Sequence, residues 1–447
     1  MASKAVAEAP APAITEAPAP GMSRALFPML ILALSVAVGF TTMQSFGIMA
    51  ESAKREMGLS DSALALIQGG GAAVPLLLFS VPIGVLVDRR SRARLMLALA
   101  SIWTIGTFVT AVAPNAAVLF GGRMLTGIGT TGALTAVLSM MADLCRPEQR
   151  GRAMLFANVG KSIGIAAGFA VAGSLLGWFG RDDGPDWFGD IAAWRSAQWT
   201  LGIVSAVLIL PLLLVREPVR HEVEAGPNAP FRVVANELWS RRRFLLPLFV
   251  GQTSVVMADG AAAIWASPVL ERFYGLAPAE FGGWLGAIIL VQGILGSILG
   301  GLLADWGQKS GRRGGLLIGA VGAAIVGVPA ALFPVMPNVT GLAVMIGVLM
   351  MAGSVTGLIT SVALTVFLPN ELRGLAIGAF IAIAGLIGFG VAPTLVTLVS
   401  SLLGGERFLA QALAGVGIVV SVVAVLGFLM AMRRAPEPAA RTVDAHA

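Results

Sequence analysis

The chain has 447 residues, of which 57% are hydrophobic and only 12% are charged, whereas soluble domains carry about 25% charged residues. This composition excludes a soluble globular fold and indicates a protein that lies within a membrane. The formal net charge of +6 does not indicate a nucleic-acid partner, because membrane proteins concentrate Lys and Arg in the loops on one side of the bilayer.

Residues 1–22 are dominated by repeats of Ala-Pro and Glu-Ala-Pro. This low-complexity composition cannot form a packed core. The segment also lacks the basic start and the short apolar stretch of a signal peptide. We expect it to be a disordered tail.

Twelve apolar stretches follow, each long enough to cross a bilayer as about 20 residues of helix. They lie at 25–50, 62–87, 94–113, 115–143, 152–179, 197–215, 244–270, 280–304, 314–334, 339–367, 374–402 and 406–432. We therefore expect an all-α membrane protein with twelve transmembrane helices in two six-helix halves. The expected domain boundaries are 23–216 for the first half, 217–243 for a linker, 244–432 for the second half and 433–447 for a tail.

The distribution of Lys and Arg predicts the orientation of these helices. With the amino terminus placed inside, the cytoplasmic segments hold 22 Lys and Arg and the outer loops hold six. The six outer cations are Lys54, Arg55, Arg181, Arg195, Arg272 and Arg407. This bias predicts that both termini and the linker are cytoplasmic.

Two short motifs of the first half return in the second half. Gly84-Val-Leu-Val-Asp88 returns as Gly301-Leu-Leu-Ala-Asp305, an offset of 217, and Glu148-Gln-Arg150-Gly151 returns as Glu371-Leu-Arg373-Gly374, an offset of 223. These pairs indicate duplicated halves related by pseudo-symmetry. Paired six-helix halves with a site between them at the midplane resemble the major facilitator fold.

Gly84-x-x-x-Asp88-Arg89-x-x-Arg92 resembles the signature loop between helices two and three of the major facilitator superfamily. Glycine lets helix ends approach, the aspartate can complement the amino end of a neighbouring helix, and the arginines are expected at the cytoplasmic headgroups. The alternative is an ordinary basic loop. The resemblance implies a latch that joins the halves in the outward-facing state, and that the second copy is weaker because Trp306 replaces the usual arginine. The residues assigned to this latch are Gly84, Asp88, Arg89, Arg92, Gly301, Asp305, Arg150 and Arg373.

Over roughly residues 30–435 the chain most resembles the bacterial spinster-like members of this superfamily, with organic-anion symporters as the nearest competitor. The similar stretches are Gly58-Leu-Ser-Asp61, Arg123-Met-Leu-Thr-Gly127, Met141-Ala-Asp143, Trp194-Arg195, Arg216-Glu217-Pro218 and Gly293-Ile-Leu-Gly296. The chain departs from that pattern in its first helix, where Phe40, Thr41, Thr42 and Met43 stand in place of an acidic motif. The fifth helix also lacks the Gly-Pro pair of drug-efflux antiporters. These departures count against the lysolipid substrates of spinster-like proteins and against drug efflux.

Three ionisable residues lie inside predicted helices, where each needs a partner, water or a substrate. Arg123 and Lys161 lie near the midplane, about 12 and 13 Å from the nearer helix end, and Asp259 lies in the outer part of its helix. Arg123 either forms a salt bridge within the first half or binds a carboxylate or phosphate bidentately. Lys161 is either a cation of the cavity or a snorkelling surface side chain.

Asp259 minus the offset of 217 gives position 42, where the first-helix acid is missing. We therefore predict that the acid has moved to the equivalent helix of the other half, where it neutralises Arg123 across the cavity and carries the coupling proton. The alternative is a bystander at the outer mouth. Neutral candidates for substrate contacts are Thr42, Gln44, Gln252 and Gln292, which otherwise make interhelical hydrogen bonds.

These observations predict a secondary transporter with alternating access for a small organic anion or amphipathic acid, coupled to protons. The alternatives are a spinster-like lipid exporter, a drug-efflux antiporter and a non-transporting sensor. We expect no enzymatic activity and no cofactor, because no nucleophile–base pair is visible at depth, and no metal site, because Cys145, His221 and His446 lack ligand spacing. We expect a monomer in the bacterial cytoplasmic (inner) membrane whose partners are the substrate, protons and the lipid bilayer, with no nucleic acid.

Overall fold

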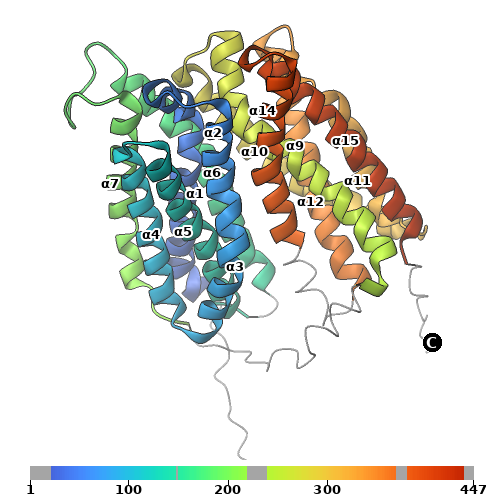
Figure 1. Cartoon of the computed structure of the whole chain (residues 1–447). Helices are drawn as coiled ribbons and strands as arrows, with labels where there is room; N and C mark the ends of the chain where they lie inside the picture. The colour runs from blue at the N-terminus through green and yellow to red at the C-terminus, as the bar shows by residue number, and fades with distance from the viewer. Residues whose placement is uncertain (1–21, 147–148, 219–238, 369–379, 437–447) are drawn as a thin grey trace, which may run out of the picture.

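The computed structural model of the chain describes residues 22–146, 149–218, 239–368 and 380–436. Within these ranges all regular secondary structure is helical. Twelve helical segments are long and apolar enough to cross a membrane. The expected fold class is confirmed, and Figure 1 shows two groups of helices side by side.

The first half contains six spans, two of which are composite. Its elements are α1 (Met22–Met57), α2 (Asp61–Ala65) continued by the π-helical η1 (Leu66–Gly70) and α3 (Gly71–Arg89), α4 (Arg92–Val112), α5 (Ala116–Asp143), α6 (Arg150–Phe179), and α7 (Ala193–Leu208) continued by η3 (Leu210–Leu214). Polar caps set several helix starts. For example, the Asn115 side chain accepts a hydrogen bond from the amide of Val118 at the start of α5.

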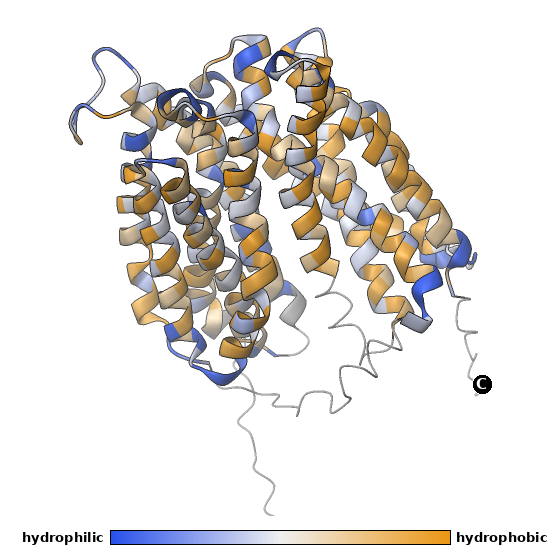
Figure 2. Ribbon diagram, in the orientation of Figure 1, coloured by the Kyte–Doolittle hydropathy of each residue, from blue (hydrophilic) through white to orange (hydrophobic). Residues whose placement is uncertain are grey.

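The second half repeats this arrangement. Its elements are α9 (Arg242–Tyr274), α10 (Pro278–Lys309), η4 (Gly315–Leu317) with α11 (Ile318–Ala330) and η5 (Phe333–Val335), α12 (Val339–Phe367), the π-helical η6 (Leu386–Val391) with α14 (Ala392–Leu403), and η7 (Glu406–Phe408) with α15 (Leu409–Arg434). Figure 2 shows hydrophilic residues gathered at the ends of the helices and hydrophobic residues along their middles. This is the pattern of helices that cross a bilayer.

The hydrophobic core is continuous between the halves at one end of the bundle and divided at the other. We call the end at Met57, Tyr274 and Leu403 the paired end, and the end at Met22 and Arg434 the terminal end. One core cluster contains residues of both halves, including Phe46 and Trp265, whereas two further clusters belong to the first half alone and to the second half alone. In Figure 1 the two groups of helices diverge towards the terminal end.

Close backbone contacts between the halves explain two of the glycines. A Cβ atom at Gly69 of η1 would lie 2.1 Å from the carbonyl oxygen of Phe389 in η6, and one at Gly286 of α10 would lie 2.5 Å from that of Ala166 in α6. Any larger residue at these positions would force the halves apart. The absence of a side chain therefore permits the close packing.

Several helices extend further than the hydropathy pattern predicted. Lys54 and Arg55 lie in the last turn of α1 and Arg272 in the last turn of α9, not in outer loops. Charged residues end the hydropathy signal, but they do not end the backbone helix when their side chains have partners. The longer α9 also corrects the position of Asp259, which lies 17 residues after Arg242 and 15 before Tyr274, at the middle of the helix and not in its outer part.

Candidate functional site

Arg123 is a buried cation on α5, about 10 Å from the helix start at Ala116. Its side chain is held by α1: Nη2 donates to the carbonyl oxygen of Met43 at 2.5 Å, and the guanidinium lies 5.0 Å from the centroid of the Phe46 ring. Its Nε atom has no hydrogen-bond partner. Within the described ranges no carboxylate forms an ion pair with Arg123, so the helix buries both a charge and a hydrogen-bond donor without a partner.

The segment beside Arg123 brings a second unpaired donor. Gln68 lies in the π-helical η1, its side chain is buried, and its Nε2 atom has no hydrogen-bond partner. One turn later, Gly71 makes room for the arginine, because a Cβ there would lie 2.7 Å from the Cβ of Arg123. Sequence reasoning missed Gln68. The available signal was an amide side chain directly before Gly69-Gly70-Gly71 in an otherwise apolar span, and π-helical turns often mark functional sites.

Asp259 is a partly buried carboxylate at the middle of α9. Its Oδ1 atom has no hydrogen-bond partner, and its Oδ2 atom lies only 1.9 Å from the position that a Cβ at Gly353 of α12 would take. Among the described residues Asp259 forms no ion pair with Arg123. The predicted pairing of these two residues therefore remains a prediction about another conformation.

Lys161 is a partly buried cation on α6, about 16 Å from the helix start at Arg150. Its Nζ atom lies 5.6 Å from the centroid of the Phe40 ring on α1. A lysine side chain reaches only about 6 Å, so this position is too deep for snorkelling from the terminal end. Lys161 and Arg123 thus both place their charge against an aromatic face of α1, an attractive cation–π geometry.

The predicted neutral residues mainly bond to protein groups in this conformation. Thr42 Oγ1 donates to the carbonyl oxygen of Gly39 at 2.9 Å. The Oε1 atoms of Gln252 and Gln292 accept from Thr360 at 3.1 Å and from Ser354 at 2.8 Å, both on α12. Gln44 packs where α1 meets Gly168 of α6. The two α12 contacts are the interhelical hydrogen bonds given as the alternative to substrate contacts.

Arg92 of the predicted signature loop is buried, and its expected place at the headgroups remains a prediction. At the start of α4 it bonds to Asp143 at 2.5 Å and to Glu217 at 2.9 Å, and it also contacts Ser139. Glu217 in addition accepts from the amide of Ala93 at 2.9 Å. Burial raises the pKa of Glu217, but the hydrogen bonds from Ala93 and Arg92 outweigh burial and hold the pKa below its usual value. Arg92 therefore joins elements within the first half.

The two glycines of the predicted latch make no close contact in this conformation. A Cβ at Gly84 would meet nothing within 4 Å, so the expected close approach at this glycine is absent in this conformation, and one at Gly301 would make ordinary contact with Leu358. Asp88, Arg89 and Asp305 are exposed. The side chain of Arg150 and all of Arg373 lie outside the described residues. The latch remains a prediction.

At the paired end, a network of seven charged residues joins the halves, and sequence reasoning missed it. Arg272 of α9 bonds to Glu51 at 2.6 Å and to Asp61 at 2.7 Å, both in the first half. Arg55 of α1 bonds to Glu271 at 2.9 Å, and Lys54 bonds to Asp61 at 2.7 Å and also to Glu406. We call these residues the paired-end network. They hold this end of the molecule closed.

A bundle of twelve membrane-spanning helices in two halves, closed at one end and carrying unpaired charge at mid-depth, defines a membrane transport protein. The chain belongs to the Major Facilitator Superfamily, whose family model matches residues 30–393. It is accordingly a multi-pass secondary transporter.

Two curated relatives are similar over most of their length. A "Probable 4-methylmuconolactone transporter" of Cupriavidus pinatubonensis is 28% identical over 399 residues, which cover 85% of this chain and 86% of that protein. A "Gentisate transporter" of Corynebacterium glutamicum is 26% identical, with 79% of this chain and 76% of that protein covered. A solved bacterial homologue of the human lysosomal transporter spinster, inward-facing and unoccupied, is 20% identical with a TM-score of 0.78 and covers 93% of this chain and 99% of that chain. The expected resemblance to bacterial spinster-like proteins is confirmed at the level of the fold.

Proposed function

We propose that this protein carries a small organic anion across the membrane by alternating access, coupled to protons. The observation that carries this proposal is Arg123, a buried guanidinium with an unpaired Nε atom and no ion pair among the described residues. A buried charge without a partner is costly. A carboxylate that bonds bidentately to the guanidinium would remove this cost and would be selected over neutral solutes.

Three further features support an anionic substrate. Lys161 adds a second cation at mid-depth, and Gln68 adds an unpaired amide donor one turn before Gly71, which approaches Arg123. The name of one relative includes gentisate, which is an aromatic carboxylate. Aromatic rings of α1 already lie against both cations, so a flat organic acid would find the charge and the apolar surface that it needs.

The conformation suggests how the cycle begins. The paired end is closed by the paired-end network, whereas the cores of the halves are separate towards the terminal end. We take the terminal end as cytoplasmic, in line with the loop charges, so this is an inward-facing state. Closure of the halves then brings Asp259 and Arg123 together, and protonation of Asp259 in that state releases Arg123 for the substrate, so that Asp259 carries the coupling proton.

For the domain boundaries we propose those that the sequence predicts, with halves at 23–216 and 244–432 on either side of the linker 217–243. We further propose that the protein works as a monomer in the bacterial inner membrane, with both termini in the cytoplasm, and has no enzymatic activity. Cysteine labelling from each side of inverted vesicles, at an engineered Ser62→Cys of the paired end, tests the orientation. Labelling of this position from the cytoplasmic side would show that the orientation is the reverse of the one proposed.

The coupling proposal is tested with purified protein in liposomes, with gentisate as the first probe of a carboxylate panel. With Asp259→Asn, exchange between equal pools should persist, while accumulation driven by a proton gradient should vanish. With Arg123→Ala, both should fail, and Arg123→Lys should restore only part of the exchange because the bidentate geometry is lost. Asp182→Asn, in an exposed loop, serves as the matched control and should behave as the wild type.

Two results would contradict parts of this proposal. If Asp259→Asn still concentrates substrate in response to pH, the aspartate is a bystander and another group carries the proton. If Arg123→Ala retains exchange of every carboxylate of the panel but loses that of a lysolipid, the substrate is the amphiphile expected from the spinster resemblance.

A further inference from the structure

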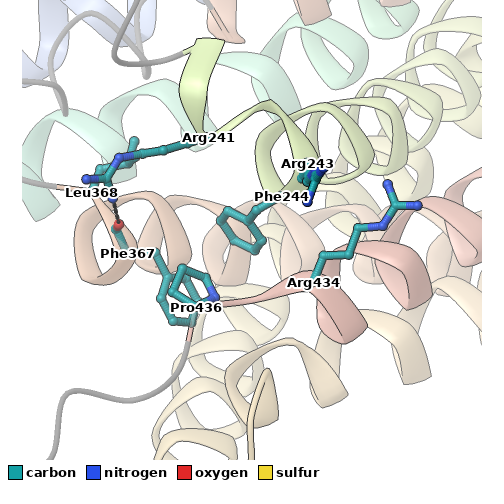
Figure 3. A pocket seen from close by; sticks show the side chains of 7 residues that line it. All are labelled: Arg241, Arg243, Phe244, Phe367, Leu368, Arg434 and Pro436. Atoms are coloured by element: carbon teal, nitrogen blue, oxygen red, sulfur yellow. Dashed lines mark hydrogen bonds between the residues drawn. The ribbon is translucent and has the colours of Figure 1, made fainter.

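The terminal end of the second half contains a cavity that the transport mechanism does not use. It has a volume of about 420 Å³ and is lined by Arg243, Arg313, Arg433 and Arg434. An adjoining cavity of about 180 Å³ shares Arg243 and Arg434 and adds an apolar side. Figure 3 shows this second cavity, with the Phe244 ring between Arg241 and Phe367 on one side and Arg243 and Arg434 on the other.

The four arginines of the larger cavity place their positive charges around one space, and no counter-ion lies among the described residues. Arg243, Arg433 and Arg434 form no ion pair with any residue in the described ranges, and none of the described residues that line the cavity is a carboxylate. Arg313 donates through Nε to the carbonyl oxygen of Ala435 at 2.7 Å, which fixes the segment before η4 against the end of α15. Four guanidinium groups around one space repel each other, so the arrangement favours a bound anion.

Flanking charge at the cytoplasmic ends of helices is the ordinary explanation for such arginines, and cations in the last turn of α15 also complement its helix dipole. Two features go beyond this explanation. The four side chains come from three separate parts of the second half, namely α9, the connection between α10 and η4, and α15. They also converge on a concave space and not on a convex helix end.

The adjoining cavity gives the charged site an apolar side. The Phe244 ring is buried and packs edge-on against Phe367, with ring centroids 5.2 Å apart, and Leu368 and Pro436 complete the lining. Further exposed apolar side chains, such as Leu246 on α9 and Met430 on α15, continue along the same helices. A charged mouth next to an apolar surface suits the head and first methylenes of an amphiphile.

We propose that Arg243, Arg313, Arg433 and Arg434 form a binding site for a phosphate group. Guanidinium groups bind phosphate oxygens bidentately, and basic pockets between transmembrane helices on the cytoplasmic side bind anionic lipid headgroups. The phosphate is supplied either by the headgroup of an anionic phospholipid or by free inorganic phosphate. In both cases the ligand ties α9 to α15 and braces the second half.

The test compares two double variants of the full-length protein that remove equal charge. Arg243→Gln with Arg434→Gln changes the site. Arg94→Gln with Arg152→Gln changes exposed cations at the terminal end of the first half. Binding of dioleoyl phosphatidylglycerol, and of dioleoyl phosphatidylcholine for comparison, is measured in detergent by native mass spectrometry. Inorganic phosphate is titrated separately while the thermal unfolding midpoint is recorded.

For a lipid headgroup, the site variant should lose affinity for phosphatidylglycerol by about thirty-fold, because each interfacial arginine contributes about a factor of five. The first-half variant should bind phosphatidylglycerol as the wild type does. Phosphatidylcholine should bind the wild type and the first-half variant more weakly than phosphatidylglycerol does. For free phosphate, the midpoint should rise with phosphate in the wild type and in the first-half variant but not in the site variant. Arg243→Lys with Arg434→Lys should retain part of either effect. Equal behaviour of the two glutamine variants in both assays would overturn the proposal.

Discussion

The most informative residues are the polar side chains that the helices bury without partners. Arg123 Nε, Gln68 Nε2 and Asp259 Oδ1 are buried atoms without a hydrogen bond. Buried polar groups are normally paired, because an unpaired one costs about 1–3 kcal/mol. Two donors in the first half and one acceptor in the second half therefore mark the surfaces that a substrate or a conformational change would satisfy.

Gly353 is expected to control the position of Asp259. A Cβ at residue 353 would lie 1.9 Å from Asp259 Oδ2, so Gly353→Ala must displace the carboxylate or part α9 from α12. We expect a loss of stability of about 1–3 kcal/mol, typical of overpacking, and a loss of proton-driven accumulation. Thermal unfolding and the liposome assay measure the two effects.

Gly322→Ala is the matched control, since it also lies in a membrane-spanning helix but a Cβ there would meet nothing within 4 Å. It should be neutral or slightly stabilising, because alanine favours the helix over glycine by about 0.5–1 kcal/mol. Equal effects of the two substitutions would show that the contact between Gly353 and Asp259 does not matter.

Lys161 is expected to act through its charge. Lys161→Ala should weaken binding of an anionic substrate about tenfold, which corresponds to the loss of about 1.4 kcal/mol of charge attraction. Binding of a neutral analogue should change much less, and Lys161→Arg should be partly tolerated. Calorimetric titration of gentisate and of its amide provides the comparison, and equal losses for both would reduce Lys161 to a packing residue.

At the scale of elements, the start of α4 is stabilised by a carboxylate from another part of the chain as well as by its own N-cap. The N-cap is Ser91, and Glu217, which follows η3, accepts from Ser91 Oγ, the Ala93 amide and Arg92. The chain after the sixth span is thus tied to the start of the third. Because Arg92 belongs to this cluster, Arg92→Ala should destabilise the first half itself. Asp88→Asn, which is expected to reduce transport while substrate binding survives, is the cleaner probe of the latch.

The cluster predicts a defined pH dependence of stability. The pKa of Glu217 is lower in the folded than in the unfolded protein, so its contribution is complete above the unfolded pKa of about 4.3 and is lost as the pH falls through the folded value. Glu217→Gln should cost about 1 kcal/mol at pH 7, as for loss of a helix cap. Unfolding measured from pH 7 to pH 3 should show the difference between wild type and variant shrinking with acid. A constant difference would mean that the carboxylate charge is irrelevant.

At the scale of the whole molecule, the paired-end network decides which end of the transporter is closed. Three cations and four carboxylates link α1 and α2 to α9 and to η7, and the Arg272, Glu51 and Asp61 side chains are largely buried. Removal of one partner of a buried ion pair costs about 3–5 kcal/mol, because the other charges are left unpaired. The same residues that end the hydropathy signal therefore bias the conformational equilibrium.

Arg272→Gln is expected to open the paired end. Spin labels at Ser62→Cys and Ser401→Cys, in a Cys145→Ser background, report the distance between the halves by double electron–electron resonance. The variant should shift the distribution to longer distances. Arg195→Gln is the control, since Arg195 bonds to Glu56 within the first half at 2.8 Å, and it should leave the distribution unchanged. An unaltered distribution in Arg272→Gln would assign the closure to apolar packing alone.

The sequence by itself determined the number of spans, their division into two halves and the candidates for buried charge. Hydropathy and the motif repeats depend on local composition, and a helix in lipid satisfies its own backbone hydrogen bonds, so these features need no tertiary information. Arg123, Lys161 and Asp259 stood out for the same reason, since charge inside an apolar span is visible in one dimension.

Only the tertiary structure decided which charges are paired and where the halves meet. The paired-end network joins residues as far apart as Lys54 and Glu406, and Arg92 proved buried because Asp143 and Glu217 lie beside it. Gln68 became a candidate only because its buried side-chain nitrogen has no partner. The converging arginines of the second half come from separate segments. Each of these depends on distances between helices, which local propensity and hydropathy do not contain.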